Sequence, residues 1–289
     1  MEPPPPSTPP SARRYATGPM SATPPVLGLL GSGNMASAMV RGWAKADPAM
    51  AERILVTDKG SGRAAALAER YGLGHTASNA ELVNAADIVV LCVKPIDVER
   101  VLREVSDLVT PRKAIASVAA GVGTATLETI LDVDAPVFRF MPNVGVSVGA
   151  GTLAFSPGRF TDTAAEQAVL EVFSLLGEVV PLEERLFDAA TALSGSGPAF
   201  LGLILEAFED AGIVAGLTHR DARRLFLSTV AGTAALLQAD DLGCADLRRM
   251  VTSPGGTAAA GLAAMERGGV RGSIIDGVSA AVRRAGELG

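Results

Sequence analysis

A glycine-rich segment near the start of the chain has the spacing of a nucleotide-binding turn. The pattern G-x-G-x-x-G/A is formed by Gly31, Ser32, Gly33, Asn34, Met35 and Ala36. Glycines at these positions permit a tight turn and let the backbone approach a pyrophosphate, which sits on the N-terminus of the following helix. An apolar run (26–30) precedes the turn and a helix-length segment (35–46) follows it. This strand-turn-helix context predicts a nucleotide site.

Charged residues after the next apolar run (54–57) bear on the choice of nucleotide. Asp58 lies about 20 residues beyond the turn, where an acidic side chain binds the ribose hydroxyls of NAD. Lys59 and Arg63 follow it, and their positive charges favour the 2′-phosphate of NADP. The two signals conflict. We expect NADP, as NADPH, to be preferred, with NAD as the alternative.

Small or polar residues also follow later apolar runs. The residues that we expect to contact the cofactor here are Val93, Lys94 and Pro95 after the run 88–93, Ala119 after 114–118, and Asn143 after 137–140. The carboxyl ends of parallel strands share one edge of a sheet, and ligands bind at that edge. Each segment alone is ambiguous, but together they predict the lining of the cofactor site.

A second candidate site lies near the end of the chain, in the run Thr-Ser-Pro-Gly-Gly-Thr at 252–257. Its glycines precede a helical segment whose first amides lack partners, and Ser253 and Thr257 add hydroxyl groups. Such a helix start attracts an anion. We therefore expect Ser253, Gly255, Gly256 and Thr257 to hold a small carboxylate. An ordinary helix start is the alternative reading.

The elements that must position these residues alternate between strands and helices. Strands are predicted at 26–30, 54–57, 88–93, 114–118 and 137–140, with helices between them. Ser78 with Glu81, and Thr163 with Glu166, have the spacing of capping boxes that open helices. This alternation predicts an α/β fold with a parallel sheet covered on both faces. After residue 182 only helical patterns follow, and the segment 187–217 is apolar nearly all round. Such a helix must be covered on every side, so a second subunit is expected.

The composition limits the class of protein. The chain has 289 residues, of which 48% are hydrophobic, and a net charge of -6. The acidic balance argues against nucleic acid as a partner, and no apolar stretch reaches the roughly 18 residues of a membrane span. Two cysteines exclude a disulfide framework and fit a reducing, cytoplasmic location. The two histidines, His75 and His219, are far apart in sequence, so we expect no metal site. Residues 1–24 are rich in proline, and we expect a disordered extension there.

Several spaced motifs together resemble the pyrroline-5-carboxylate reductases of proline synthesis. The motifs, in order, are the glycine turn 31–36, Val-Lys-Pro at 93–95, Met-Pro-Asn at 141–143, Ala-Leu-Ser-Gly-Ser-Gly-Pro-Ala at 192–199 and Thr-Ser-Pro-Gly-Gly-Thr at 252–257. The ending, from Leu262 to the Glu-Leu-Gly at 287–289, is also similar to that family. The resemblance runs from about residue 26 to the end and leaves out the proline-rich extension.

This resemblance implies the organisation and the activity. It implies a Rossmann-type, mostly parallel sheet domain (25–182) and an all-α dimerisation domain (183–289) that interleaves with a partner. The homodimer would often assemble further into a ring. The implied reaction is reduction of the cyclic imine (S)-1-pyrroline-5-carboxylate to L-proline by NAD(P)H. In that family Ser253 and the backbone after the glycines would receive the substrate carboxylate, Asn79 would contact the cofactor ribose, and Lys94-Pro95 would lie along the cofactor.

One position departs from the family pattern. Family members usually carry threonine at the second position after the glycine pair, and its hydroxyl approaches the imine nitrogen. Here Ala258 occupies that position and Thr257 the one before it. Ser253, Thr257 and Ala258 are the candidate catalytic positions. The substitution leaves two alternatives to an active reductase of this imine: a reductase of a related cyclic imine, and a nucleotide-binding sensor with weakened catalysis.

Overall fold

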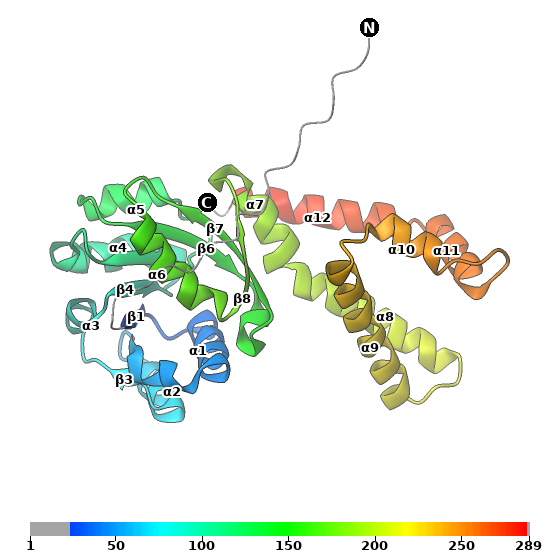
Figure 1. Ribbon diagram of the computed structural model, residues 1–289, viewed down its shortest axis with the longest axis horizontal. Helices are drawn as coiled ribbons and strands as arrows, with labels where there is room; N and C mark the ends of the chain where they lie inside the picture. Colours follow the sequence, from blue (N-terminus) through cyan, green and yellow to red (C-terminus); the bar gives the residue numbers. More distant parts are fainter. Residues whose placement is uncertain (1–23, 288–289) are drawn as a thin grey trace, which may run out of the picture.

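The computed structural model describes residues 24–287. Residues 1–23, and with them nearly all of the expected proline-rich extension, lie outside the described residues, as do 288 and 289. Figure 1 shows a sheet with helices on both faces, followed by a group of helices that extends away to one side. The α/β domain followed by a helical region is therefore confirmed.

The sheet has eight strands within the described part of the chain, in the order β3-β2-β1-β4-β5-β6-β7-β8. In chain order they are β1 (Leu27–Leu30), β2 (Ile54–Thr57), β3 (Gly74–His75), β4 (Ile88–Leu91), β5 (Ala114–Ser117), β6 (Val137–Pro142), β7 (Gly151–Pro157) and β8 (Gly177–Pro181). All neighbouring pairs are parallel except β6 with β7. The order reverses at β1 and β4, which creates the crevice where such sheets bind ligands.

Helices connect the strands of the sheet, and after β8 the described chain continues with helices and no further strand. Those of the sheet domain are α1 (Asn34–Ala46), α2 (Arg63–Tyr71), α3 (Asn79–Ala85), α4 (Pro95–Val105), α5 (Thr124–Leu131) and α6 (Thr163–Ser174). Those that follow β8 are α7 (Phe187–Ala190), α8 (Gly197–Val214), α9 (His219–Ala239), α10 (Cys244–Met250), α11 (Thr257–Arg267) and α12 (Val270–Gly286). The five predicted strands are all present, but β3, β7 and β8 were not predicted.

One of the two predicted helix caps is confirmed and the other is wrong. Ser78 caps α3 as expected, with its hydroxyl accepting from the Glu81 amide at 3.1 Å. The expected cap at Thr163 is wrong by one residue: the Asp162 carboxylate accepts from the Ala165 amide at 2.7 Å. A carboxylate at this position both accepts the hydrogen bond and opposes the positive end of the helix dipole, which explains why Asp162 prevails over its threonine neighbour.

The apolar segment 187–217 is not one helix. A π-helical turn, Thr191–Gly195, separates α7 from α8. Pro198 lies in the first turn of α8, where its missing amide hydrogen costs nothing, so a new helix begins there. A Cβ on Gly195 would lie 2.9 Å from the Met141 side chain. The small residue therefore lets the π-helical turn pack closely on β6, which joins the helical region to the sheet.

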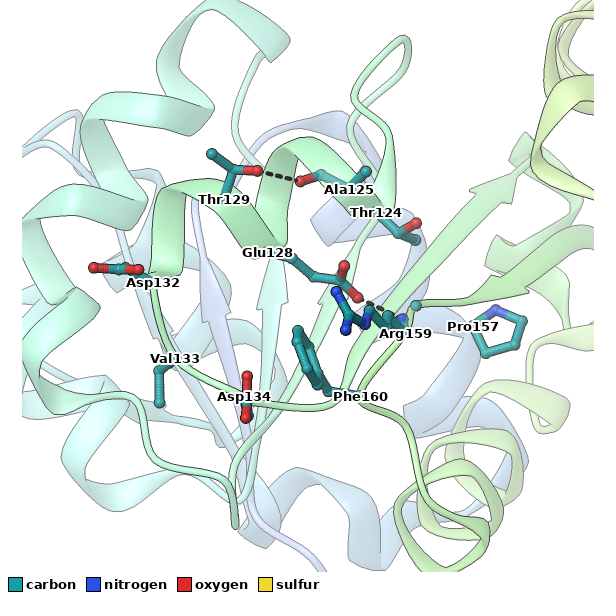
Figure 2. Close-up of a pocket in the computed structure, with 11 residues that line it drawn as sticks. Thr124, Ala125, Glu128, Thr129, Asp132, Val133, Asp134, Pro157, Arg159 and Phe160 are labelled. Carbon is teal, nitrogen blue, oxygen red and sulfur yellow. Dashed lines mark hydrogen bonds between the residues drawn. The ribbon is translucent and has the colours of Figure 1, made fainter.

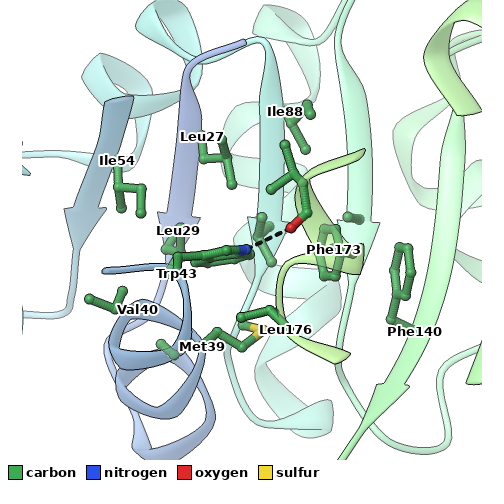
Figure 3. Packing of buried hydrophobic residues seen from close by; sticks show 14 of the residues in the cluster. Leu27, Leu29, Met39, Val40, Trp43, Ile54, Ile88, Phe140, Phe173 and Leu176 are labelled. Carbon is green, nitrogen blue, oxygen red and sulfur yellow. Dashed lines mark hydrogen bonds between the residues drawn. The ribbon is translucent and has the colours of Figure 1, made fainter. Parts of the chain in front are cut away.

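Two apolar layers hold the sheet domain together. Helices α1, α2 and α6 cover one face, and α3, α4 and α5 cover the other. At the centre of the first layer, Trp43 is fully buried, and its indole N–H donates to the Val172 carbonyl at 2.8 Å (Figure 3). Its ring meets Phe173 edge-on at 5.8 Å. On the same helix, a Cβ at Gly42 would collide with the Val146 carbonyl. These contacts fix the position of α1 and of the glycine turn before it.

The helical region leaves large apolar side chains uncovered within one chain. The most exposed on α8, α9 and α12 include Leu201, Leu203, Leu225 and Ile275, each more than half exposed. No part of residues 24–287 covers these side chains, so another surface must. This agrees with the expectation that a second subunit covers these helices. Among the helices of residues 24–287, none combines the length and the hydrophobicity needed to cross a membrane.

Candidate functional site

The glycine turn connects β1 to α1 at the point where the strand order reverses. Gly31 has φ +100°, and a Cβ there would lie 3.0 Å from both the Cys92 carbonyl and the Val93 side chain. Any larger residue would strain and crowd the turn. Gly33 caps α1 without a side-chain hydrogen bond, and a Cβ on it would meet nothing within 4 Å. The first amides of α1 therefore face free space, which fits a pyrophosphate.

The other residues of the turn have different surroundings. Ser32 is buried, and its hydroxyl donates to the Thr57 carbonyl at 3.2 Å, which ties the turn to the end of β2. Met35 is half-buried and packs on the core. Asn34 is exposed at the first position of α1. Of these side chains, Asn34 is the one free to meet a ligand, whereas Ser32 and Met35 hold the turn.

Asp58 is bound by its own loop. Its carboxylate accepts from the amides of Gly60 at 2.8 Å, Ser61 at 3.1 Å and Ala64 at 2.8 Å, and from the Ser61 hydroxyl at 2.6 Å. Burial opposes ionisation of Asp58, but these hydrogen bonds, led by the Ser61 hydroxyl, outweigh it and lower its pKa to about 2. The carboxylate thus organises the start of α2, and its acceptor sites are already used.

Lys59 and Arg63 are placed differently. The Lys59 ammonium pairs with Asp97 at the start of α4, at 2.5 Å. Arg63 is exposed at the start of α2, and its Nε donates to the Ser61 hydroxyl at 3.3 Å. Together with Ser32 and Asn34, Arg63 lines a pocket of about 430 Å³ beside the glycine turn. The structure therefore brings Arg63, but not the bound carboxylate of Asp58, to a ligand-sized space.

The other predicted cofactor residues follow β4 and β5. Lys94 caps α4 without a side-chain hydrogen bond and is exposed; Pro95 is the first residue of that helix. Val93 is half-buried against Gly31. Ala119 is buried, and its amide donates to the Ser117 hydroxyl at 3.3 Å. All of these lie after the carboxyl ends of β4 and β5, at the same edge of the sheet as the glycine turn that follows β1.

Two asparagines of the predicted site take part in hydrogen bonds of their own. Asn143 accepts from the Gly145 amide at 3.0 Å and donates to the Ser194 hydroxyl at 3.2 Å. It therefore links the end of β6 to the π-helical turn. Asn79, at the start of α3, donates to the Glu104 carboxylate on α4 at 3.1 Å. Sequence patterns alone did not reveal either partner.

The second site is built by a turn before α11. Gly255 has φ +71°, follows Pro254, and the Gly256 amide donates to the Ser253 carbonyl at 3.0 Å. This is the geometry of a type II turn, which requires glycine at its third position. A Cβ on Gly256 would collide with the Ser253 hydroxyl. Gly256 caps α11 without a side-chain bond, so the first amides of α11 and the exposed Ser253 are free to bind a carboxylate.

The first two residues of α11 include the position at which this chain departs from the family pattern. Thr257 is exposed at the first position of the helix, and Ala258 is half-buried at the second. The methyl group of Ala258 cannot donate a proton, so the one hydroxyl in this first turn belongs to Thr257. In Figure 1, α11 lies at the far end of the helical region, away from the sheet domain that carries β1 and α1. One chain therefore does not bring its own two candidate sites together.

A polar network that the sequence did not predict joins the two regions. Glu184, in the short 3-10 helix before α7, accepts from the Thr124 amide and hydroxyl, both at 2.8 Å. It also pairs with Arg139 on β6 at 3.1 Å. The Arg139 guanidinium lies 4.3 Å from the centre of the Phe187 ring on α7. Burial opposes ionisation of Glu184, but the hydrogen bonds from Thr124 and Arg139 lower its pKa. No motif signalled this cluster, because its members are distant in sequence.

Another pocket, of about 710 Å³, lies beside α5 (Figure 2). Glu128 accepts from the Arg159 amide across its wall. The pocket reaches Asp132 and Asp134, which precede β6, and thus lies toward the amino end of that strand. None of the predicted site residues lines it.

Other candidate groups have ordinary surroundings. His75 and His219 are both exposed. Glu206 and Asp210 are exposed on α8, as solvated carboxylates should be. Within residues 24–287, no three His, Cys, Asp or Glu side chains gather as they would around a metal ion.

Comparison with known proteins assigns both regions. Residues 26–121 match the family model described as "NADP oxidoreductase coenzyme F420-dependent", and residues 184–288 match "Pyrroline-5-carboxylate reductase dimerisation". A pyrroline-5-carboxylate reductase of Methanosarcina acetivorans is 35% identical over 91% of this chain and 97% of its own.

Solved structures agree with these matches. The pyrroline-5-carboxylate reductase of Coxiella burnetii is 33% identical, with a TM-score of 0.83 over 92% of this chain and 99% of that one. The Plasmodium falciparum enzyme, solved with NADP bound, is 27% identical, with a TM-score of 0.80 over 94% of this chain and 100% of that one.

Proposed function

Because the chain belongs to the pyrroline-5-carboxylate reductase family, we propose how its residues carry out that family's reaction. The protein is an oxidoreductase that reduces 1-pyrroline-5-carboxylate to proline with a nicotinamide nucleotide. The observation that carries this function is the pair of helix starts without side-chain caps, at α1 and α11, in a chain that covers 97% of its Methanosarcina acetivorans relative. One fits a pyrophosphate and the other a carboxylate.

The cofactor lies along the carboxyl edge of the sheet. The amides that follow Gly33 bind the pyrophosphate, Asn34 and Arg63 face the adenosine ribose, and Lys94-Pro95 flank the nucleotide. Ala119 and Asn143 would line the same edge further on, and Asn79 would contact the ribose. When bound, the nicotinamide supplies a hydride to the imine carbon.

NADPH is the preferred cofactor. Asp58, the residue that would bind the free ribose hydroxyls of NADH, already accepts four hydrogen bonds within its loop. Arg63 is available at a pocket next to Asn34, where a 2′-phosphate would lie. NADH remains a usable but weaker substitute, because the pyrophosphate site is common to both.

The substrate carboxylate binds at the start of α11. Ser253 donates its hydroxyl, and the amides that follow Gly256 donate from the backbone, aided by the helix dipole. Holding the carboxylate orients the imine carbon toward the hydride donor, which is the main contribution the protein must make.

Proton supply is the step affected by Ala258. The imine nitrogen must gain a proton as its carbon accepts the hydride. Ala258 has no hydroxyl, so the proton comes from solvent before transfer, with Thr257 as the nearest donor in the same helical turn. A positively charged imine accepts a hydride readily, so the reaction proceeds without a strong protein acid.

The active site is shared between two chains. The α1 and α11 helix starts lie at opposite ends of one chain, and the helical region exposes large apolar side chains. A homodimer that packs these helices together brings α11 of the partner toward the sheet domain. We also propose that residues 25–182 form the cofactor domain and residues 183–289 the dimerisation domain. The dimers would assemble further into a ring. A cytoplasmic location is consistent with the free thiols of Cys92 and Cys244.

The test is turnover by the purified full-length protein. Loss of NADPH absorbance with racemic 1-pyrroline-5-carboxylate, and proline among the products, should be measured from pH 6 to 10, with NADH in parallel. We expect proline with both cofactors and a higher kcat/KM with NADPH. Nucleotide binding without any proline would overturn the assignment. Full activity from a monomer in light scattering at assay concentration would overturn the shared site.

A further inference from the structure

The pocket of about 430 Å³ beside the glycine turn has an unusual lining. The residues are Ser32, Asn34, Ser37, Ala38, Arg41, Arg63, Ala66, Leu67, Arg70, Tyr71 and Ser147. They include three arginines and no acidic residue, although the whole chain has a net charge of -6. Arg63 was expected from the sequence, but Arg41 and Arg70 belong to no motif.

The helix geometry explains why these residues share one pocket. On α1 the lining residues between Asn34 and Arg41 follow the spacing i, i+3, i+4, i+7, and on α2 those between Arg63 and Arg70 follow the same spacing. Residues at these spacings share one face of a helix. Helices α1 and α2 lie side by side (Figure 1). The two arginine-bearing faces therefore form the walls of one groove that opens at the glycine turn.

The three guanidinium groups are free to bind an anion. All three residues are exposed, and among residues 24–287 none of them forms an ion pair with a carboxylate. Arg70 lies over the Tyr71 ring at 5.3 Å, and Arg63 Nε donates to the Ser61 hydroxyl. Long side chains on a helix lean back toward its N-terminus, here toward the glycine turn. Side chains of this length can therefore reach from both walls toward the mouth of the groove.

We propose that Arg41 and Arg70, together with Arg63, form the anion pocket that selects a nucleotide carrying a phosphate on its adenosine ribose. This inference rests on the proposed function, because it places the nucleotide on the glycine turn. A ribose 2′-phosphate carries about two negative charges and several acceptor oxygens, which guanidinium groups match with paired N–H donors. The nearby side chains of Ser37 and Asn34 add neutral donors. A ribose with free hydroxyls gains little from these groups, so the arginines discriminate NADPH from NADH.

The experiment measures binding directly, without turnover. Calorimetric titration of the full-length protein with NADPH and with NADH gives both Kd values for the wild type, Arg41→Gln, Arg70→Gln and the double variant. We expect each single change to weaken NADPH binding about 3- to 10-fold, where tenfold corresponds to about 1.4 kcal/mol. The NADH Kd should stay within about twofold. Arg70→Lys should retain part of the preference for NADPH, because lysine keeps the positive charge but lacks the planar guanidinium that donates two parallel hydrogen bonds.

A matched control separates local recognition from net charge. Arg112 is exposed just before β5, at the amino end of that strand, so Arg112→Gln removes the same charge far from the groove. It should change neither Kd by more than about twofold. If the Arg41 and Arg70 variants bind NADPH like the wild type, or lose NADH equally, the inference is wrong while the proposed function stands. If the folded wild type binds neither nucleotide, the proposed function fails and the inference fails with it.

Discussion

Replacing Glu184 tests whether the network at the junction of the two regions stabilises the fold. In Glu184→Gln the side chain keeps its shape but loses its charge. The Gln oxygen can still accept from Thr124, whereas Arg139 loses its counter-ion. The Arg139 side chain is only 10% exposed and that of Glu184 31% exposed. This pair is therefore neither a surface ion pair, worth about 0–1 kcal/mol, nor a fully buried one, whose disruption costs about 3–5 kcal/mol.

The magnitude follows from the bonds that change. A hydrogen bond to a charged group contributes about 1.5–3 kcal/mol, and a neutral one about 1 kcal/mol. Because Glu184→Gln weakens bonds without deleting the acceptor, we expect a loss of about 1–2 kcal/mol in the free energy of unfolding. Glu184→Ala also leaves the Thr124 donors unpaired, so we expect about 2–4 kcal/mol from the same contributions.

The assay is urea unfolding at a fixed protomer concentration, because the stability of the proposed dimer would depend on concentration. Glu183→Gln is the matched control: its carboxylate pairs with Arg185, and both side chains are about 70% exposed, so a change below about 0.5 kcal/mol is expected. Equal effects of Glu183→Gln and Glu184→Gln would refute the reasoning.

The effect should also depend on pH in a defined direction. The folded-state pKa of Glu184 lies below its ordinary value of 4.5. Its ionised form therefore contributes stability that is fully present above about pH 4.5 and is lost as the pH falls through the folded pKa. The stability difference between the wild type and Glu184→Gln should be constant near neutral pH and should shrink in acid. A difference that grows below pH 4.5 would contradict the assigned sign.

Three further changes test the site and its support. Ser253→Ala should raise the KM for the imine acid about tenfold or more, the equivalent of a charge-assisted hydrogen bond of about 1.5–3 kcal/mol, and leave the KM for NADPH nearly unchanged; equal shifts in both would count against the carboxylate site. Ala258→Thr should raise kcat, most clearly above pH 8, where solvent protonates the imine poorly; a pH profile identical to the wild type's would exclude a role for this position. Trp43→Phe should lower the free energy of unfolding by about 1–3 kcal/mol, because the buried Val172 carbonyl loses its donor; unchanged urea unfolding would show that the bond contributes nothing.

The sequence predicted the parts of the fold that local patterns encode. Continuous apolar runs such as Ile88–Leu91 mark central strands, because both faces of those strands are covered. The antiparallel strand β7 was not predicted because its segment begins with glycine and no α-helical pattern separates it from β6; the connection holds only a short 3-10 helix, Val144–Val148. Strand β8 carries exposed and half-buried residues at the sheet edge and has no continuous apolar run. Pairing with a neighbour, rather than local pattern, makes it a strand.

In the candidate site, too, some features could be predicted from the sequence and others could not. Backbone-dependent features were predictable: Gly31 and Gly255 sit where φ is positive, and such positions are marked in the sequence by glycine itself. Side-chain partners were not predictable. The sequence offered Asp58 as a ribose ligand, but only the structure shows four donors already bound to it. Arg70 carries no motif, and it becomes relevant only because α2 lies beside α1.

The division of the site between two ends of the chain explains why the junction matters for catalysis. Hydride transfer requires the reacting carbons to approach to roughly 3–3.5 Å, and small misplacements reduce the rate strongly. The glycine turn is fixed by Trp43 and Gly42 within the sheet domain, whereas the carboxylate cradle at Ser253 is carried by the helical region. In the proposed dimer, every change in the angle between these regions would move α11 relative to the partner's sheet domain. The Arg139–Glu184 pair and the Asn143–Ser194 hydrogen bond are polar contacts that span this junction. These two contacts therefore keep the two regions at a fixed distance, a role for which none of the four residues need touch the substrate.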